Sequence, residues 1–465
     1  MNPRVAVGIA PDVRQLLAED PSQLSALLEE IHDEDLADLL GMLDENEAAL
    51  VLKTLAAEDA APILERLDEE TQEAMVEQLG PLSMAPILSE MSADERTDLI
   101  EALPDDVGDS LLASLEKVDP EAAAEVEELA KWPEDSAGGL MTTDFVSVGI
   151  QLTVADVIER IRKVGEDAET IYYVYVVTAQ ERLLGVASLR DLLLAPSPSA
   201  KLADVMTEDV FAVSPETDQE EVARLMAKYD FNALPVINED RKLLGVITVD
   251  DVMDVLTEEQ DEDVQRIGGM QPLEQGYFQT PFWSFIKKRV TWLSFLFVGG
   301  FFTGTALRHF DSMIQTLATL SYYVPLLISA GGNSGSQSST LVIRGLATNE
   351  LRVGDWHRVL VREVAQGLVL GLCLGTIAIV RVLWWGDGLR MALTIAVTLV
   401  TIVIMGCTVG SMMPMLLRRV GLDPATSSTP FIASLVDVLG IVLYFTVAQV
   451  LMAEALSTVP VPPAH

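Results

Sequence analysis

The sequence has 465 residues and a formal net charge of −41, yet its mean hydropathy is positive at +0.31. Division of the chain at residue 276 reconciles these values, because the first part carries −45 and the remainder +4. The acidic part excludes nucleic acid as a partner, since binding to a phosphate backbone requires lysine and arginine. We therefore expect an acidic soluble half that attracts divalent cations, or uses its acids for solubility alone, followed by a membrane half.

The stretch from about residue 20 to 131 contains a strict repeat of twelve residues. An apolar residue recurs at this spacing, and two more follow it eight and nine positions later. The recurring residues are Ile31, Leu43, Leu55, Leu67, Leu79, Met91, Leu103 and Leu115. Acidic turns such as HDED, DENE and SADE separate them and suit the N-termini of helices. The pattern predicts short helices stacked into an all-α superhelix, for which a plain scaffold is the simplest role.

A second repeat follows, with two copies at residues 136–196 and 197–257. The segments LMTTDFVSV and LLGVASLRDLLL recur as VMTEDVFAV and LLGVITVDDVMD. Each copy is predicted to fold as strand, helix, strand, turn, strand and helix, and the two resemble a tandem pair of α/β CBS domains. Each copy contains a Ser or Thr followed three residues later by Asp, in SLRD and in TVDD. The resemblance implies that these residues bind an adenine nucleotide such as ATP, unless their side chains only cap the next helix. The four residues are Ser188, Asp191, Thr248 and Asp251.

An acidic connector helix is predicted within residues 250–283. Eight acids lie between Asp250 and Asp263. Helical periodicity places four of them on one stripe: Asp251, Asp254, Glu258 and Glu262. Like charges at such spacings destabilise a helix by ~0.2–0.5 kcal/mol per pair. The stripe is therefore either solvated or occupied by cations, and oxygen ligands of this kind suit Mg²⁺ or Ca²⁺.

Residues 285–455 are predicted to form a bundle of five helices that cross a lipid bilayer. The expected spans are 290–307, 313–343 with an internal break, 364–385, 391–417 and 426–453. Nine lysines and arginines flank these spans on the side of the acidic half, against three on the other side. The positive-inside rule therefore places the acidic half in the cytoplasm and the C-terminus outside.

Asp437 is an ionisable group near the middle of the fifth predicted span. A carboxylate at that depth costs at least ~2.5 kcal/mol, so it should face a protein interior or a wet path. No lysine or arginine lies in the middle of a span to neutralise it, which favours an ion path over a structural ion pair.

The second predicted span contains Pro325 and the sequence GGNSGSQ, which indicate a broken helix that lines a pore. Tight packing of small residues is the alternative. The oxygen-bearing side chains of this stretch are Asn333, Ser334, Ser336 and Gln337.

The order of acidic repeat (residues 1–131), CBS pair, connector and five spans resembles the MgtE family of magnesium transporters. The motifs that carry the resemblance are PLLISAGGNSGSQSS, the LMTT and TVDDV boxes, and DPATSSTPFIASLVDVLG. It implies a homodimer in a bacterial cytoplasmic membrane, with a central Mg²⁺ pore at Asp437. Asn333, Ser336, Gln337 and Ser434 would border this pore. The implied cytoplasmic magnesium ligands are Asp94, Asp98, Asp218, Glu220, Asp230, Asp251, Asp254, Glu259, Glu262 and Asp263.

Together these features predict a Mg²⁺-selective channel or transporter that closes when intracellular Mg²⁺ bridges the carboxylates of the acidic half. An enzyme is not expected, because the sequence contains no HExxH, GxSxG or Walker motif. Two alternatives stay open. One is a carrier for another divalent cation such as Co²⁺ or Ca²⁺, and the other is a nucleotide-sensing membrane protein that transports nothing.

Overall fold

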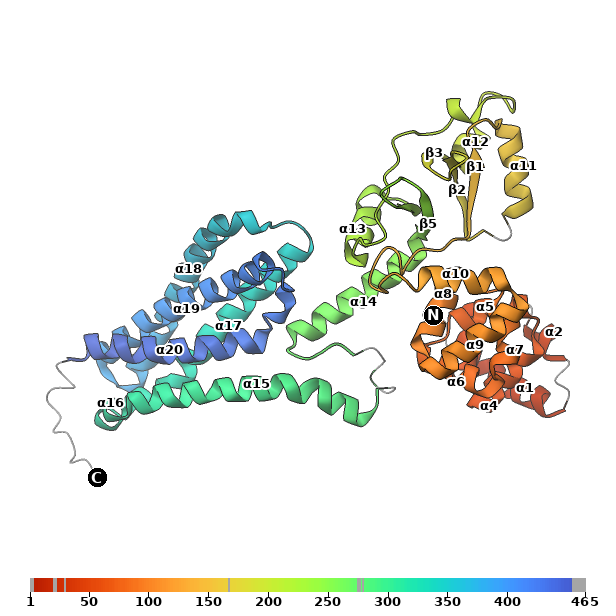
Figure 1. The fold of residues 1–465 in the computed structure, drawn as a ribbon. Helices are drawn as coiled ribbons and strands as arrows, with labels where there is room; N and C mark the ends of the chain where they lie inside the picture. The colour runs from red at the N-terminus through yellow and green to blue at the C-terminus, as the bar shows by residue number, and fades with distance from the viewer. Residues whose placement is uncertain are drawn as a thin grey trace. The chain divides into compact units, whose positions relative to one another are not determined.

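A computed structural model describes residues 4–19, 23–28, 31–165, 168–273, 277 and 280–453. The chain divides into two compact units, residues 1–257 and 258–465. The first unit contains an all-α domain and two α/β modules, and the second contains long helices (Figure 1). The predicted multi-domain fold class is therefore confirmed.

The N-terminal domain is built from the twelve-residue repeat. Two helices, α1 (Arg4–Glu19) and α2 (Leu24–Leu28), precede it. The repeat helices begin at residues 33, 45, 57, 69, 81, 93 and 105, which confirms the predicted period. They are α3 (Asp33–Leu40), α4 (Glu45–Thr54), α5 (Ala57–Glu65), α6 (Glu69–Leu79), α7 (Pro81–Leu88), α8 (Ala93–Ala102) and α9 (Asp105–Val118), and α10 (Pro120–Leu129) follows them.

The acidic turns of the repeat start helices, as the sequence predicts, and their side chains cap α3, α4 and α6 but not α8 or α9. Asp44 forms a capping box with Glu47 at the start of α4. Ser92 precedes α8 without capping it, and its amide donates instead to Glu65 Oε1 at 2.8 Å. The apolar residues of successive helices form one continuous core, so every short helix is stabilised by its neighbours.

The first CBS module follows the predicted order of elements. It comprises β1 (Phe145–Gly149), α11 (Val154–Val164), β2 (Thr170–Val177), β3 (Leu183–Ser188) and α12 (Leu189–Leu193). The strand order is β1-β2-β3, with β1 parallel and β3 antiparallel to β2.

The second module lacks the full first strand that its sequence VMTEDVFAV predicts. That strand is reduced to one bridge between Val213 and Val236, and the sheet has two strands. Thr207 exchanges two backbone hydrogen bonds with Val186 of the first module, and Thr142 does the same with Val246 of the second, so this pairing does not explain the difference between the modules. The elements of the second module are the 3₁₀ turn η2 (Leu202–Asp204), α13 (Gln219–Tyr229), β4 (Ala233–Ile237) and β5 (Leu243–Thr248).

The acidic connector is helix α14 (Val249–Ile267), which directly follows β5. It ends before Gly269, whose φ of 77° favours glycine and stops the helix. Of the connector predicted over residues 250–283, α14 thus covers the part up to Ile267, and the last two residues already belong to α15 (Phe282–His309).

The second unit contains five long helices, joined by short turns (Figure 1). Four of them are long and apolar enough to cross a membrane, by length and composition. The remaining long helix, α17, has 29 residues, or about 43 Å at 1.5 Å per residue, so it is long enough to cross a bilayer. The polar stretch at its centre lowers its mean hydropathy. The elements are α15 (Phe282–His309), α16 (Asp311–Thr316), α17 (Thr319–Ala347), η3 (Val353–Asp355), α18 (Trp356–Trp385), α19 (Gly388–Arg419), η4 (Pro424–Thr426) and α20 (Thr429–Leu451).

The internal break predicted for the second span lies elsewhere: the range 313–343 is interrupted at residues 317–318, between α16 and α17, and not at Pro325 or the glycines. Helix α17 is continuous through Pro325 and residues 331–336. Its glycines allow close packing with α19: a Cβ added at Gly410 would lie 2.0 Å from the carbonyl oxygen of Gly335. A Cβ added at Gly406 would likewise lie 2.5 Å from the oxygen of Gly331. The alternative of tight packing through small residues therefore describes these glycines.

Candidate metal sites and a nucleotide pocket

A cluster of carboxylates lies where α8 faces the start of α14, within the first unit. Asp94 is only 8 % exposed, and its Oδ1 has no hydrogen-bond partner in the described chain. Burial, followed by repulsion from Asp251 and Glu95, holds its pKa well above the usual range. A buried carboxylate oxygen without a partner is costly. This position therefore favours a proton or a cation.

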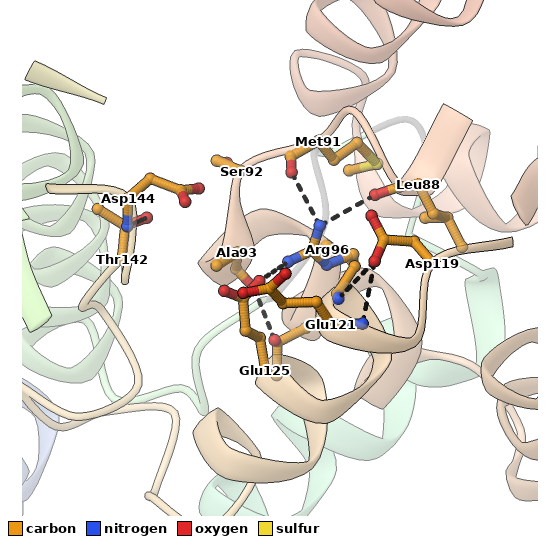
Figure 2. Close-up of polar contacts among 12 residues, drawn as sticks. Leu88, Met91, Ser92, Ala93, Arg96, Asp119, Glu121, Glu125, Thr142 and Asp144 are labelled. Atoms are coloured by element: carbon orange, nitrogen blue, oxygen red, sulfur yellow. Dashed lines mark hydrogen bonds and ion pairs between the residues drawn. The ribbon is translucent and has the colours of Figure 1, made fainter. Parts of the chain in front are cut away.

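Arg96 holds the first turn of α8 in place and is 3 % exposed. Figure 2 shows its guanidinium donating to the carbonyls of Leu88 and Met91 and to Glu125 Oε2. The ion pair with Glu125 measures 2.7 Å. Because Glu125 and these two carbonyls engage Arg96, its charge is already largely compensated and does little to neutralise Asp94. The acids of α8 are thus held on a rigid turn.

The Thr248–Asp251 box closes this cluster from the second CBS module. The hydroxyl and the amide of Thr248 both donate to Asp251 Oδ2. Thr248 is buried at 4 % exposure, and Asp251 faces the acids of α8. Negative phosphates would be repelled at this position, so the arrangement favours a cation here over the nucleotide that the resemblance implies.

Burial and mutual repulsion raise the pKa of every acid in the cluster. The pKa of Glu95 rises to about 8, first through burial and then through repulsion from Asp98. Desolvation and repulsion from Glu134 raise the pKa of Asp98 to about 7, although its side chain reaches solvent. Burial also raises the pKa of Asp251 and of Asp254. A bound divalent cation would relieve this crowding of negative charge.

Three further predicted ligands have structural roles at the two ends of α13. Asp218 caps the helix by accepting the amides of Glu220 and Glu221. Asp230 ends it in the left-handed conformation, with φ of 55°. Glu220 forms an ion pair with Arg224 one turn further along. These contacts account for the three acids without a metal.

The far end of α14 belongs to the second unit and is tied to the loop before α20. Arg266 Nη2 lies 2.6 Å from Glu262 Oε2, and Nη1 lies 2.8 Å from Asp423 Oδ2. Glu259 also acts on Arg266 electrostatically. The predicted ligands Glu259 and Glu262 thus lie near the positively charged guanidinium of Arg266. Asp263, the third predicted ligand here, follows Glu262 on the same helix.

Among the described residues, no group of three or more His, Cys, Asp or Glu side chains is arranged to hold a metal ion. The carboxylates are crowded without forming a closed coordination shell.

Two members of the α8 cluster, Glu95 and Glu169, are not among the residues predicted from the sequence. Glu95 adjoins Asp94 and lies three positions before Asp98, so the helical face could have revealed it. Glu169 lies in the loop before β2, where no periodicity applies. Burial and repulsion from Asp251 raise its pKa to about 7.

Asp437 of the second unit lies on α20 and faces α17. A Cβ added at Gly332 would lie 3.8 Å from Asp437 Oδ1. No hydrogen bond or ion pair joins this carboxylate to another side chain of the described residues, and it is only partly buried. A carboxylate with these properties between apolar helices is a candidate ion ligand.

An exposed polar row runs along α17, next to this position. Its members are Ser329, Asn333, Gln337 and Thr340. Within a bilayer such a row is costly against lipid, so it should face water or protein. The other two predicted pore residues are half-buried: Ser336 donates to the carbonyl of Thr429 at 3.4 Å, and Ser434 lies on α20.

A cavity of ≈ 210 Å³ lies at the first box, between the two CBS modules. Ser188 and Asp191 line it, with Ser188 donating to Asp191, and the rings of Phe211 and Phe231 line it as well. The hydroxyl of Tyr175 is buried at the same cavity without a partner in the described chain. The cavity can therefore stack an aromatic base and hydrogen-bond a sugar hydroxyl.

Known families match each part of the chain. The MgtE family, described as divalent cation transporter, matches residues 324–447, the MgtE intracellular N domain matches 31–135, and CBS domains match 137–197 and 202–258. The magnesium transporter MgtE of Thermus thermophilus is 45% identical over 335 residues, which cover 72% of this chain and 74% of that one. This chain belongs to the MgtE family. It is therefore a membrane protein of a transporter family and not an enzyme.

Other MgtE proteins and structures show the same likeness. The magnesium transporter MgtE of Bacillus subtilis is 35% identical over 338 residues, 72% of this chain and 73% of that one. The crystal structure of the cytosolic domain of the Mg²⁺ channel MgtE in complex with ATP covers 53% of this chain and 99% of that chain, at 43% identity and a TM-score of 0.50. The soluble part of a magnesium transporter gives 32% identity and a TM-score of 0.51, covering 55% and 99%.

The raised pKa values predict a stability that falls as pH rises. The folded chain binds protons at these carboxyls more tightly than the unfolded chain, where they titrate near ~4, so stability declines from about pH 4 to about pH 8, the pKa of Glu95. In chelator, the full-length protein in detergent should melt at a lower temperature at about pH 8 than at about pH 5.5. Asp94→Asn should reduce this difference.

The matched control for that experiment is Asp106→Asn. Asp106 occupies the position of Asp94 one repeat later and is exposed, so it should leave the pH dependence unchanged. The control also accounts for the general repulsion within an acidic protein. A melting temperature that is equal or higher at the alkaline pH would contradict the prediction.

Proposed function

We propose that this chain is a Mg²⁺-selective channel or transporter of a bacterial cytoplasmic membrane, closed by intracellular Mg²⁺. The observation that carries the proposal is Asp437, which has no hydrogen-bond or ion-pair partner among the described residues and lies beside a polar row on apolar helices. The names of the relatives support Mg²⁺ as the ion. The positive-inside rule supports an acidic half in the cytoplasm and a C-terminus outside.

The ion path is proposed to form between two copies of the chain. In a homodimer, two Asp437 side chains would face one another near the axis. Mg²⁺ gives up its waters reluctantly, so a pair of carboxylates suits a hydrated ion. The exposed Asn333 and Gln337 would line the same path, with Ser336 and Ser434 behind them. The polar row of α17 would then face water rather than lipid.

Closure by Mg²⁺ is proposed to begin at the α8 cluster. With little bound Mg²⁺, repulsion between Asp94, Asp98 and Asp251 loosens the N-terminal domain from the CBS pair. The N-terminal domain is taken as residues 1–131 and the CBS pair as residues 136–257. Bound Mg²⁺ would bridge these acids and favour the closed state, and it shifts the equilibrium only by its preference for that state. Asp254 extends this site on α14. The proposed ligands also include Asp218, Glu220 and Asp230, which would have to give up contacts at the ends of α13 to bind the ion.

Helix α14 is proposed to carry the signal, because it starts in the first unit and ends in the second. Its end is joined through Arg266 and Asp423 to the loop before α20, the helix of Asp437. Glu259, Glu262 and Asp263 would bind Mg²⁺ along this end.

ATP or another adenine nucleotide is proposed to bind at Ser188 and Asp191, where the cavity lies. A relative's cytosolic domain was crystallised with ATP. The Thr248–Asp251 box faces carboxylates instead. One nucleotide per chain is therefore the expected stoichiometry.

The pore proposal predicts that Asp437→Ala abolishes most Mg²⁺ flux into liposomes that carry the purified protein. Loss of the charged ligand should reduce the flux by about tenfold or more, equivalent to ~1.4 kcal/mol. Glu350→Gln, which changes an exposed acid after α17, is the control. Equal flux from Asp437→Ala and wild type would overturn the assignment, and parallel assays with Co²⁺ and Ca²⁺ test the alternative of another divalent cation.

The closure proposal predicts that Mg²⁺ protects α14 of the full-length protein from protease. Protection should increase through millimolar Mg²⁺, because bridged carboxylates fix the helix. Asp94→Asn should raise the concentration needed by about tenfold, the effect of losing one charged ligand, whereas Asp106→Asn should not. Digestion that does not change across the titration would count against a cytoplasmic sensor.

The nucleotide proposal predicts saturable ATP binding by calorimetry, at one site per chain. Asp191→Asn should weaken binding by roughly tenfold, because the ribose loses a charged acceptor. Glu159→Gln, on an exposed face of α11, should bind like the wild type. Two sites per chain, or binding unaffected by Asp191→Asn, would show that the nucleotide lies elsewhere.

A further inference from the structure

A second carboxylate, Glu363, is buried in the helices of the second unit. It lies on α18 at 6 % exposure, and its Oε2 accepts a hydrogen bond from Ser338 of α17 at 2.6 Å. No lysine or arginine forms an ion pair with it in the described chain. Burial of a carboxyl group without a counter-ion is costly, so Glu363 should have a structural or functional role that offsets this cost.

Three glycines follow Glu363 on the same side of α18, each four residues after the last. They are Gly367, Gly371 and Gly375, and each packs on the backbone of α19. A Cβ added at Gly367 would lie 2.9 Å from the Cα of Ile404. Glu363 therefore lies on the α19 side of α18, where it also reaches Ser338 of α17.

Helix α19 completes this junction of three helices. Cys407 of α19 is 2 % exposed and interacts with the hydroxyl of Ser338. Along the rest of their contact, α17 and α19 approach through glycine backbones, at Gly331 with Gly406 and Gly335 with Gly410. Smooth glycine surfaces provide little interlocking of side chains, and lipid provides no hydrophobic force that would set the rotation of one helix against another.

We propose that Glu363 is a positioning residue for the ion path, and that its hydrogen bond with Ser338 sets the rotation of α17. Ser338 directly follows Gln337, so a rotation of α17 about the glycine seam moves Asn333 and Gln337 away from Asp437. Glu363 does not itself line the path, because it is buried among α17, α18 and α19. The inference rests on the proposed transport of Mg²⁺.

The hydrogen bond, rather than the negative charge, is the required feature. The bond from Ser338 is the hydrogen bond that the described chain shows at the carboxyl group, and a glutamine carbonyl can accept it in the same place. Glu363→Gln should therefore retain the function that Glu363→Ala loses. Ser338→Ala should behave like Glu363→Ala, because it removes the other partner of the same bond.

The experiment measures Mg²⁺ flux in liposomes together with the reactivity of Cys407 toward a membrane-permeant maleimide. Cys373, the other cysteine, is exposed and is replaced by serine in every variant. Glu363→Ala and Ser338→Ala should each lower the flux by roughly tenfold, the effect of a lost hydrogen bond to a charged group, and their combination should lower it no further. Both should speed the labelling of Cys407, and Glu363→Gln should restore wild-type values of both readouts.

Labelling separates this inference from the proposed function, because it reports the contact without any transport. Absence of Mg²⁺ flux in the wild type would overturn the transport proposal and the positioning role with it, whereas labelling would still test the contact. Multiplicative losses in the double variant, or a Glu363→Gln variant as impaired as Glu363→Ala, would overturn the positioning role. So would normal flux in Glu363→Ala. Each variant is first shown by gel filtration to elute like the wild type.

Discussion

The structure depends on carboxylates that lie close together with no lysine or arginine between them. On α8 and α14 the cost is visible in Asp94, whose Oδ1 is buried without a partner, and in Glu95, whose pKa rises to about 8. Folding brings these groups together only because the repeat core and Arg96 hold α8 rigidly. Burial of the apolar core therefore offsets the free-energy cost of the repulsion within the acidic cluster. The repulsion therefore favours any state in which these carboxylates move apart, or in which protons or cations neutralise them.

The regular parts of the fold could be predicted because they depend on local periodicity. The twelve-residue period correctly predicted where the repeat helices begin, since each unit repeats one turn and one apolar face. Prediction failed where a second segment decides the outcome. The glycines of α17 were expected to break the helix, but α19 packs against them and keeps it intact. The first strand of the second CBS module is reduced to one bridge at Val213, which the likeness of the two sequence copies does not predict.

The candidate sites divide in the same way. Asp437 could be found from the sequence because a carboxylate within an apolar span is costly wherever the helix lies. Asp94 and Asp251 were paired only through a family resemblance, since no sequence spacing relates two residues so far apart. Glu363 escaped notice because the third span was expected to begin one residue later, at Val364, which left the acid in a loop. Its burial depends on the contact of α18 with α17 and α19.

The two ends of α14 deal with negative charge in different ways, and this difference bears on the proposed closure. At the start of the helix Asp251 accepts hydrogen bonds from Thr248 and faces the acids of α8, and no lysine or arginine of the described chain forms an ion pair with it. At the far end Arg266 already forms ion pairs with Glu262 and Asp423. A Mg²⁺ ion that took Glu262 would leave Arg266 to Asp423 alone, and so would tighten the tie to the loop before α20. Binding at both ends would thus act in the same direction, toward a fixed α20 and a fixed Asp437.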